Sequence, residues 1–460
     1  MKKMQNKKIA AGLSIGLACC APVMGQSSDA LLDKLVEKGV LSVKEANTLR
    51  EETDKDFNKA YSIKSGMPDW VSSLKINGDL RGRFDEIKID NGSQAASVQD
   101  RDRFRYRARL GATATMFDDM EVGLRLCSGD DYSKNNNYDF GGSQFSGNTT
   151  MNNDASRKFV FLDLAYAKYT PAKWVELQFG KMLNQFWVSP MIVSPDYNPE
   201  GAQEKFSFAL DDKNTLNFTG GEWVINENNP GRDVYMFAGQ VDWTAKWTKS
   251  ISSRLGVMTY SFLNPSATTA NVEAFVANSN NGTPLAGTSV QANPNLTYGA
   301  QNINPIIGRA EVTYNLESFP LYTGGFPVTA SGEYANNPAA NGKIHLANGS
   351  YTAQPYSGLQ NEAFSLGVTF GNSKAKGNWQ VGYTYKNIET ASLWRGLMDD
   401  NFGYGGKGGT DVRGHLVSAS YRVFTPFLVQ FQYFITEPIN QTAKYQGESD
   451  RMLVDLIWSF

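Results

Sequence analysis

The chain ends in the stretch Asp450-Arg451-Met452-Leu453-Val454-Asp455-Leu456-Ile457-Trp458-Ser459-Phe460. Every second residue of it is large and apolar: Met452, Val454, Leu456, Trp458 and Phe460. The residues between them, including Asp455 and Ser459, would fall on the opposite face of an extended strand. This period-two alternation predicts a β-strand with one apolar face and one largely polar face.

The same pattern recurs upstream through most of the chain. Sixteen segments show it, at 74–84, 103–115, 119–128, 158–169, 174–182, 203–210, 213–219, 233–247, 251–263, 305–316, 322–335, 362–371, 377–388, 412–424, 427–437 and 450–460. The pattern therefore predicts an all-β protein built from many similar strands.

The connections between these segments alternate in length. Short ones are predicted near 117–118, 170–171, 211–212, 248–249, 317–318, 372–373 and 425–426, and long polar loops at 129–157, 184–202, 264–304, 336–361 and 389–411. Outer-membrane barrels combine an even number of strands with short turns at one end and long loops at the other. We expect a transmembrane antiparallel β-barrel of about 16 strands over residues 71–460. A soluble β-solenoid or multi-sandwich protein is the alternative.

Aromatic residues near the strand ends agree with a membrane barrel, because such barrels carry aromatic girdles at both interfaces. The candidates are Trp174, Trp243, Trp247, Trp379, Tyr433 and Trp458. The bulk composition argues against membrane-spanning helices, since the mean hydropathy is -0.40 and each helical span needs about 20 apolar residues. With 44 basic and 46 acidic residues, the composition carries no sign of nucleic-acid binding.

The first 25 residues have the features of a signal peptide. Four lysines precede an apolar run that starts at Ile9, and Val23 and Gly25 are the small residues of a cleavage site before Gln26. A lipid anchor at Cys19 or Cys20 is the less favoured alternative. Residues 26–70 predict a helical hairpin and linker on the periplasmic side, as a local spacer or an oligomerisation element. Only Cys127 remains after cleavage, so no intrachain disulfide is expected.

Three stretches make the chain resemble the putative porin family of bacterial outer-membrane proteins: Leu31 to Gly39 with the helix that follows, Gly180-Lys181-Met182 leading into Asp196 to Gly201, and Gly409 to His415. Phe460 is similar to the terminal assembly signal of outer-membrane proteins. The resemblance implies a diffusion channel in the outer membrane of a Gram-negative bacterium. Its expected partners are outer-membrane lipids, the barrel-assembly machinery and small hydrophilic solutes, with a homotrimer by analogy to general porins.

The segment Arg101 to Arg109 has an arginine at every odd position. In a strand these side chains share one face, and a charge on the lipid side near the midplane costs about 2 to 4 kcal/mol. We expect a pore-lining basic wall on neighbouring strands, formed by Arg81, Arg83, Arg101, Arg103, Arg105, Arg107, Arg109 and Arg125. Alternatively, these arginines only pair with interior carboxylates, of which the candidates are Asp79, Glu121, Asp163 and Glu176.

The third long connection is unusual for a solvated loop, because it holds three prolines and several apolar residues. In general porins the third loop folds inward and places carboxylates opposite arginines. By that resemblance, Asp196 and Glu200 are candidates for a constriction. The alternative is a turn at the rim of the barrel.

No motif predicts an enzyme, a cofactor or a transition-metal site. His345 and His415 have no cysteine partners nearby in sequence, and the Gly-x-Ser-x-Gly at residues 12–16 lies in the signal peptide. Oxygen-rich clusters at Asp130, Asp131 and Asp139, or at Asp399 and Asp400, fit either calcium sites or hydrated loops. The sequence favours a passive, anion-favouring channel. A structural or adhesive barrel without an open pore is the alternative.

Overall fold

The computed structural model describes residues 38, 68, 70–90, 100–117, 119–130, 146–151, 157–227, 233–263, 296–297, 303–340, 343–346, 351–353, 358–406, 408–441 and 447–460. The chain divides into two compact units, residues 1–69 and 70–460. The predicted signal peptide at 1–25 and nearly all of the predicted hairpin and linker at 26–70 lie outside the described residues.

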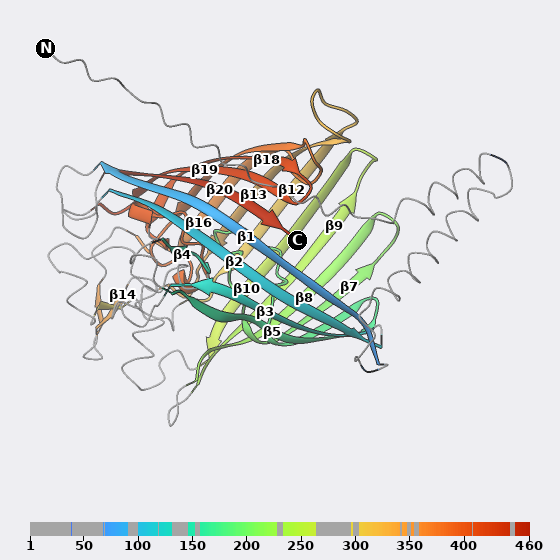
Figure 1. Ribbon diagram of the computed structural model, residues 1–460. Coiled ribbons are helices and arrows are strands. Elements are labelled where there is room, and N and C mark those ends of the chain that lie inside the picture. The colour runs from blue at the N-terminus through green and yellow to red at the C-terminus, as the bar shows by residue number, and fades with distance from the viewer. Residues whose placement is uncertain are drawn as a thin grey trace, which may run out of the picture. The chain divides into compact units, whose positions relative to one another are not determined.

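The second unit is a closed barrel of sixteen long antiparallel strands (Figure 1), as the sequence predicted. The strands are β1 (Val71–Asp90), β2 (Arg101–Met116), β3 (Met120–Gly129), β5 (Phe159–Ala172), β6 (Val175–Lys181), β7 (Glu200–Ala209), β8 (Asn214–Asn226), β9 (Val234–Lys246), β10 (Ile251–Leu263), β12 (Ile306–Leu316), β13 (Phe326–Asn336), β16 (Glu362–Gly371), β17 (Trp379–Ile388), β18 (Val412–Phe424), β19 (Phe427–Pro438) and β20 (Glu448–Ser459).

Short elements belong to the long connections. The strand β4 (Thr149–Thr150) pairs with β2, while β11 (Leu296–Thr297), β14 (Lys343–Leu346) and β15 (Tyr351–Ala353) form a separate small sheet. Two 3-10 turns, η2 (Arg395–Leu397) and η3 (Tyr404–Gly406), lie between β17 and β18. Within the described ranges, no helix is long and apolar enough to cross a membrane.

The barrel closes where the first strand pairs with the last, from Asp79 opposite Ser459 to Asp90 opposite Glu448. Beyond this ladder, Phe460 exchanges two backbone hydrogen bonds with Gly78, both 3.0 Å long. The Phe460 ring lies where a side chain at residue 78 would project, since a Cβ there would be 2.5 Å from the ring. The terminal residue is thus part of the seam.

The two faces of the wall differ as the alternation predicted. Apolar side chains on one face are exposed, including Ile76, Leu80, Phe104 and Leu110. Their neighbours in sequence, such as Arg81 and Arg105, are buried on the opposite face, which is the inside of a closed barrel. The exposed apolar face is therefore the outer surface, the reverse of a soluble protein.

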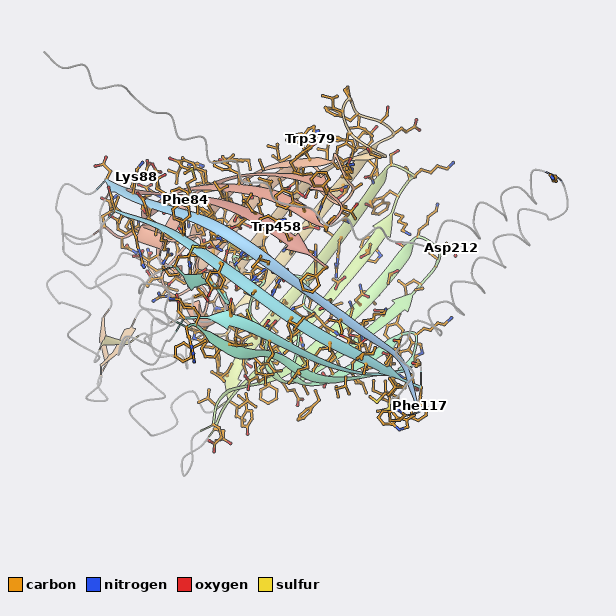
Figure 2. The ribbon with its side chains drawn as sticks, viewed as in Figure 1. Phe84, Lys88, Phe117, Asp212, Trp379 and Trp458 are labelled. Atoms are coloured by element: carbon orange, nitrogen blue, oxygen red, sulfur yellow. The ribbon has the colours of Figure 1, made fainter. Side chains whose placement is uncertain are left out.

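Figure 2 places Phe117 and Asp212 at one end of the barrel and Lys88 toward the other. We call the first the turn end and the second, where the long connections lie, the loop end. Two turns are longer than predicted, 317–325 and 372–378, and β13 starts at Phe326 instead of residue 322. Stacking of Phe319 on Phe326, with ring centroids 4.1 Å apart, holds this segment in an aromatic cluster instead of a strand.

Other strand ends also shift. The strand β1 is longer than the predicted 74–84, and β8 continues beyond residue 219. The turn after β5 lies at residues 173–174 and not at 170–171, because an irregularity between Tyr169 and Ala172 adds residues to that strand.

Candidate functional site

Four arginines of β1 and β2 form a square on the inner face. Arg81 lies opposite Arg107 in the strand register, and Arg83 lies opposite Arg105. Their side chains are only 4 % to 7 % exposed. Like charges directly opposite each other destabilise a sheet. The square therefore requires negative charge from other parts of the chain.

Aspartates on the neighbouring positions of the wall supply part of that charge. Asp79 accepts hydrogen bonds from Arg109 Nε at 2.5 Å and from Arg107 Nη2 at 3.2 Å. Asp163 on β5 accepts one from Arg125 Nε, also at 2.5 Å. Two of the four carboxylates that the sequence offered as partners are thus paired with arginines of the predicted basic wall.

The last strand contributes further pairs. Asp455 binds Arg83 through both carboxylate oxygens, with Nε–Oδ1 and Nη2–Oδ2 distances of 2.6 and 2.7 Å. Arg451 binds Asp85 in the same two-pronged way, with both distances 3.0 Å, and Arg103 Nε donates to the same carboxylate at 2.8 Å. Because fork-to-fork pairs of arginine and carboxylate are strong and directional, they fix the arginine side chains in place.

One carboxylate reaches the cluster from the connection between β6 and β7. Asp196 accepts a hydrogen bond from Arg107 Nη1 at 2.9 Å and lies 3.9 Å from Arg109 Nη1. Residue 198 of the same connection is also attached to the wall, since Asn198 Nδ2 donates to Asp163 Oδ1 at 2.7 Å. Residues 182–199 therefore lie against the inner face and not outside the barrel.

The same connection is also anchored to another set of strands. Two guanidinium groups lie over the Trp187 ring, with Arg254 of β10 at 4.4 Å and Arg309 of β12 at 4.7 Å from its centroid. Gln240 of β9 accepts from the Trp187 backbone N–H at 2.7 Å and donates to its carbonyl at 2.9 Å. Ser189 hydrogen-bonds Glu333 of β13. Residues 182–199 thus bridge β9–β13 and β2 inside the barrel.

A model of the family described as putative porin matches residues 90–291 and 309–460. The chain belongs to the putative porin family. It is an outer-membrane protein, and its family and fold point to a channel and not to an enzyme. A search of curated proteins found no match.

Solved porins resemble this porin only distantly. Salmonella typhi OmpF, in complex with daunomycin, is 9% identical with a TM-score of 0.45, over 84% of this chain and 97% of that one. Pseudomonas putida OprB at low pH is 8% identical with a TM-score of 0.43, over 84% and 92%. Vibrio cholerae OmpT lacking loop L8 is 11% identical with a TM-score of 0.41, over 84% and 99%.

The porin has a second connection folded inside the barrel, residues 389–411, which was expected to be a polar loop. That expectation is wrong, because five of its apolar side chains are buried: Leu393, Trp394, Leu397, Met398 and Phe402. They pack with Phe186, Met191, Ile192 and Val193 in one hydrophobic cluster. The two connections are also joined by backbone hydrogen bonds, of which Ser194 N–H to Leu397 O is 2.6 Å long.

Residues 399–401 of this connection extend to the arginines. Arg451 Nη1 donates to the Asp400 carbonyl at 3.0 Å, and Arg83 Nη1 donates to Asn401 Oδ1 at 3.4 Å. Burial, reinforced by the adjacent Asp400, raises the pKa of the Asp399 carboxyl to about 6. Residues 400 and 401 thus bring a carbonyl and an amide oxygen to Arg451 and Arg83, and the Asp400 carboxylate lies close enough to act on the charge of Arg83.

Two predicted site residues do not join the cluster. Glu200, the first residue of β7, is 64 % exposed and binds Lys181 at 2.8 Å, so only Asp196 meets the arginines. Arg101 is exposed at the start of β2. Of the other proposed partners, Glu121 binds Tyr166 and Lys168, and Glu176 accepts from Gln178.

The sequence prediction missed Asp85, Arg451 and Asp455. Their parity places all three on the inner face, but their importance depends on the pairing of β1 with β20. The calcium candidates have protein partners instead: Asp130 accepts from Thr150 Oγ1, and Asp399 accepts from Asn401 Nδ2. Asp131 and Asp139 lie outside the described residues, among which no group of three His, Cys, Asp or Glu residues is placed to hold a metal ion.

Proposed function

We propose that this porin is a passive channel for small hydrophilic solutes or ions, with a preference for anions set by the arginines of β1, β2, β3 and β20. The observation that carries the proposal is a surplus of positive charge on one part of the inner face. Eight arginines gather there: Arg81, Arg83, Arg103, Arg105, Arg107, Arg109, Arg125 and Arg451. They contact five aspartates: Asp79, Asp85, Asp163, Asp196 and Asp455. The Asp400 carboxylate also lies close enough to act on the charges of Arg83 and Arg105, so eight arginines less six aspartates leave a surplus of two positive charges.

The mechanism requires neither a cofactor nor an energy source. Residues 182–199 narrow the interior beside the arginines, so a solute that passes must come close to them. Salt screens charges only beyond about 8 to 10 Å, so a narrow passage lined by guanidinium groups attracts anions and repels cations. Asp196, which binds Arg107, is the carboxylate of this constriction.

A second candidate function is a structural or adhesive barrel without a substantial open pore. The shared hydrophobic cluster of residues 182–199 and 389–411 favours it, because this cluster fills space inside the barrel. The low exposure of Arg81, Arg83 and Arg105 points the same way.

Conductance in planar lipid bilayers distinguishes the two. Discrete open channels support the porin function, whereas a barrel that stays closed supports the structural one. In a KCl gradient, replacing Arg103, Arg105 and Arg107 by Gln should move the zero-current potential toward cation selectivity. Arg413→Gln is the matched control, because Arg413 binds Glu437 on the outer face. An unchanged potential in the triple variant with intact conductance would refute the anion preference.

We also propose that a signal peptide at 1–25 exports the chain, that the barrel-assembly machinery inserts it, and that it forms a homotrimer. General porins support the last proposal by analogy. Comparing the mass in detergent of the mature chain with that of a form lacking residues 28–60 tests whether the predicted hairpin holds the oligomer together. An equal mass would exclude that role.

A further inference from the structure

In the part of the chain that the structure describes, no carboxylate forms a two-pronged pair with either Arg81 or Arg105 of the inner-face square. Arg81 donates from Nη2 to the amide oxygen of Asn148 at 2.6 Å, which supplies no charge. Arg105 lies 3.6 Å from Asp85, but that carboxylate already receives the two-pronged bond from Arg451 and a bond from Arg103. Among the described residues, Arg81 and Arg105 therefore have the weakest direct contacts with carboxylates, although the Asp400 carboxylate also acts on the charge of Arg105.

Both side chains are nevertheless withdrawn from water. Arg81 is 7 % exposed and Arg105 is 4 % exposed. Among the described residues, the Nε atom of each is buried without a hydrogen-bond partner, as is that of the adjacent Arg107. A buried charge without a partner is strongly unfavourable, and so is a buried N–H donor without an acceptor. A bound anion would relieve both costs.

The strand register puts the two groups within reach of one such anion. Arg81 is opposite Arg107, and Arg105 is opposite Arg83, so Arg81 and Arg105 are diagonal neighbours on adjacent strands. Diagonal positions are about 7 to 8 Å apart, a spacing that long side chains can bridge. Aspartates hold the other two corners of the square, Asp455 at Arg83 and Asp196 at Arg107. The unfilled positions thus lie along one diagonal.

We propose that Arg81 and Arg105 together bind one doubly charged oxyanion of the size of sulfate or hydrogen phosphate. Two guanidinium groups match two negative charges, and these balance the surplus of two positive charges in the cluster. Guanidinium groups recognise pairs of oxygen atoms, which a chloride ion does not offer. The site deepens the proposed anion preference and rests on it for a role in solute selection, although binding itself requires no open pore.

The test is calorimetric titration of the detergent-solubilised full chain with sodium sulfate and with sodium phosphate, against sodium chloride at equal ionic strength. Saturable binding of one oxyanion per chain is expected. Arg81→Gln and Arg105→Gln should each weaken it about tenfold or more, because each removes charged hydrogen bonds. Arg413→Gln, the same change on the outer face, should leave the affinity unchanged.

Arg81→Lys and Arg105→Lys keep the charge and so guard against loss of folding. They should still weaken oxyanion binding, because an ammonium group lacks the planar fork. Absence of saturable binding, equal binding of chloride, or an affinity unaffected by these substitutions overturns the proposal. Conductance of the same samples separates the two claims: binding without channels refutes the proposed function alone, and channels without binding refute this site alone.

Discussion

The Arg83 guanidinium and the Asp455 carboxylate join the first strand of the barrel to the last. The two residues are direct partners in the β1–β20 register, and their two-pronged pair, with distances of 2.6 and 2.7 Å, is almost fully buried. Asp85 and Arg451 form a second two-pronged pair between these strands with the charges reversed, as diagonal neighbours, since Asp85 lies opposite Leu453 and Arg451 lies opposite Ile87. The seam is therefore held by side-chain ion pairs as well as by backbone hydrogen bonds.

Replacing Asp455 by Asn should weaken the barrel markedly. The substitution leaves Arg83 buried with its charge uncompensated, and breaking a buried pair in this way costs about 3 to 5 kcal/mol. Urea unfolding of the folded porin in lipid vesicles measures the loss. Glu448→Gln, at the outer end of the same strand, is the control and should change little. The double variant Arg83→Gln, Asp455→Asn should recover part of the stability, because no unpaired charge remains. Both single variants, Arg83→Gln and Asp455→Asn, are measured for comparison. If the double variant loses as much unfolding free energy as the two single variants together, the two residues do not stabilise the barrel as a pair.

Deletion of Phe460 should reduce the yield of folded porin in the outer membrane. The deletion removes two backbone hydrogen bonds to Gly78 and an exposed aromatic side chain at the end of the seam. It should also disturb the terminal signal that we expect the assembly machinery to recognise. The measurement is the amount of heat-modifiable barrel in isolated outer membranes. Phe460→Tyr keeps the backbone bonds and the ring, so it should restore the yield. A normal yield after deletion would show that the seam closes without this residue.

Trp187→Ala should loosen residues 182–199. The substitution removes both cation–π contacts, each worth about 0.5 to 2 kcal/mol, while the backbone bonds to Gln240 remain. If the porin conducts, its single-channel current should become larger and noisier. Trp174→Ala, at an exposed position of the turn end, is the control. Unchanged current and noise would mean that the connection does not limit conduction.

The period-two pattern was sufficient to predict the sixteen strands and the inward side of the arginines, because one face of each strand is apolar. Asp79 and Asp163, two of the four carboxylates offered as alternative partners of the arginines, do pair with them. The local pattern cannot predict contacts between strands that are far apart in the sequence. The pairs that involve Asp85, Arg451 and Asp455 follow from barrel closure, which brings together residues about 370 positions apart.

The composition of residues 389–411 indicated that they fold inward, but the segment was predicted to be a solvated loop from its length. Leu393, Trp394, Leu397, Met398 and Phe402 are too apolar for a solvated loop, as residues 184–202 were recognised to be. The apolar side chains of residues 389–411 are buried because they pack against those of residues 184–202 inside the barrel. Composition within each long loop therefore deserves the same weight as its length.

Asp411 should make the loop end sensitive to pH. Its side chain is 3 % exposed, and it accepts hydrogen bonds from the Asn440 backbone at 3.1 Å and from the Asn440 amide at 2.6 Å. It thereby joins the connection before β18 to the one after β19. Burial raises the pKa of the Asp411 carboxyl to about 7, and the hydrogen bonds from Asn440 oppose this only in part.

A raised carboxyl pKa means that the folded state binds the proton more tightly than the unfolded state. Its stabilising effect is complete below the unfolded pKa of about 3.9, and it is lost as the pH rises through about 7. Hydrogen exchange at residues 439–441 should therefore be faster at pH 8 than at pH 5, after correction for the intrinsic rate. Asp411→Asn should remove most of this difference, because its amide oxygen still accepts from Asn440 and asparagine tolerates the positive φ of 66°.

A second variant is needed for the connection formed by residues 389–411, because its Asp399 has a pKa of about 6 and also titrates between pH 5 and pH 8. Asp399→Asn should remove pH dependence from residues 389–406 and leave that of residues 439–441. Asp211→Asn is the control, because hydrogen bonds at the turn end lower the pKa of Asp211, which stays ionised throughout. If exchange at residues 439–441 keeps its full pH dependence in Asp411→Asn, then Asp411 is not the group that titrates there.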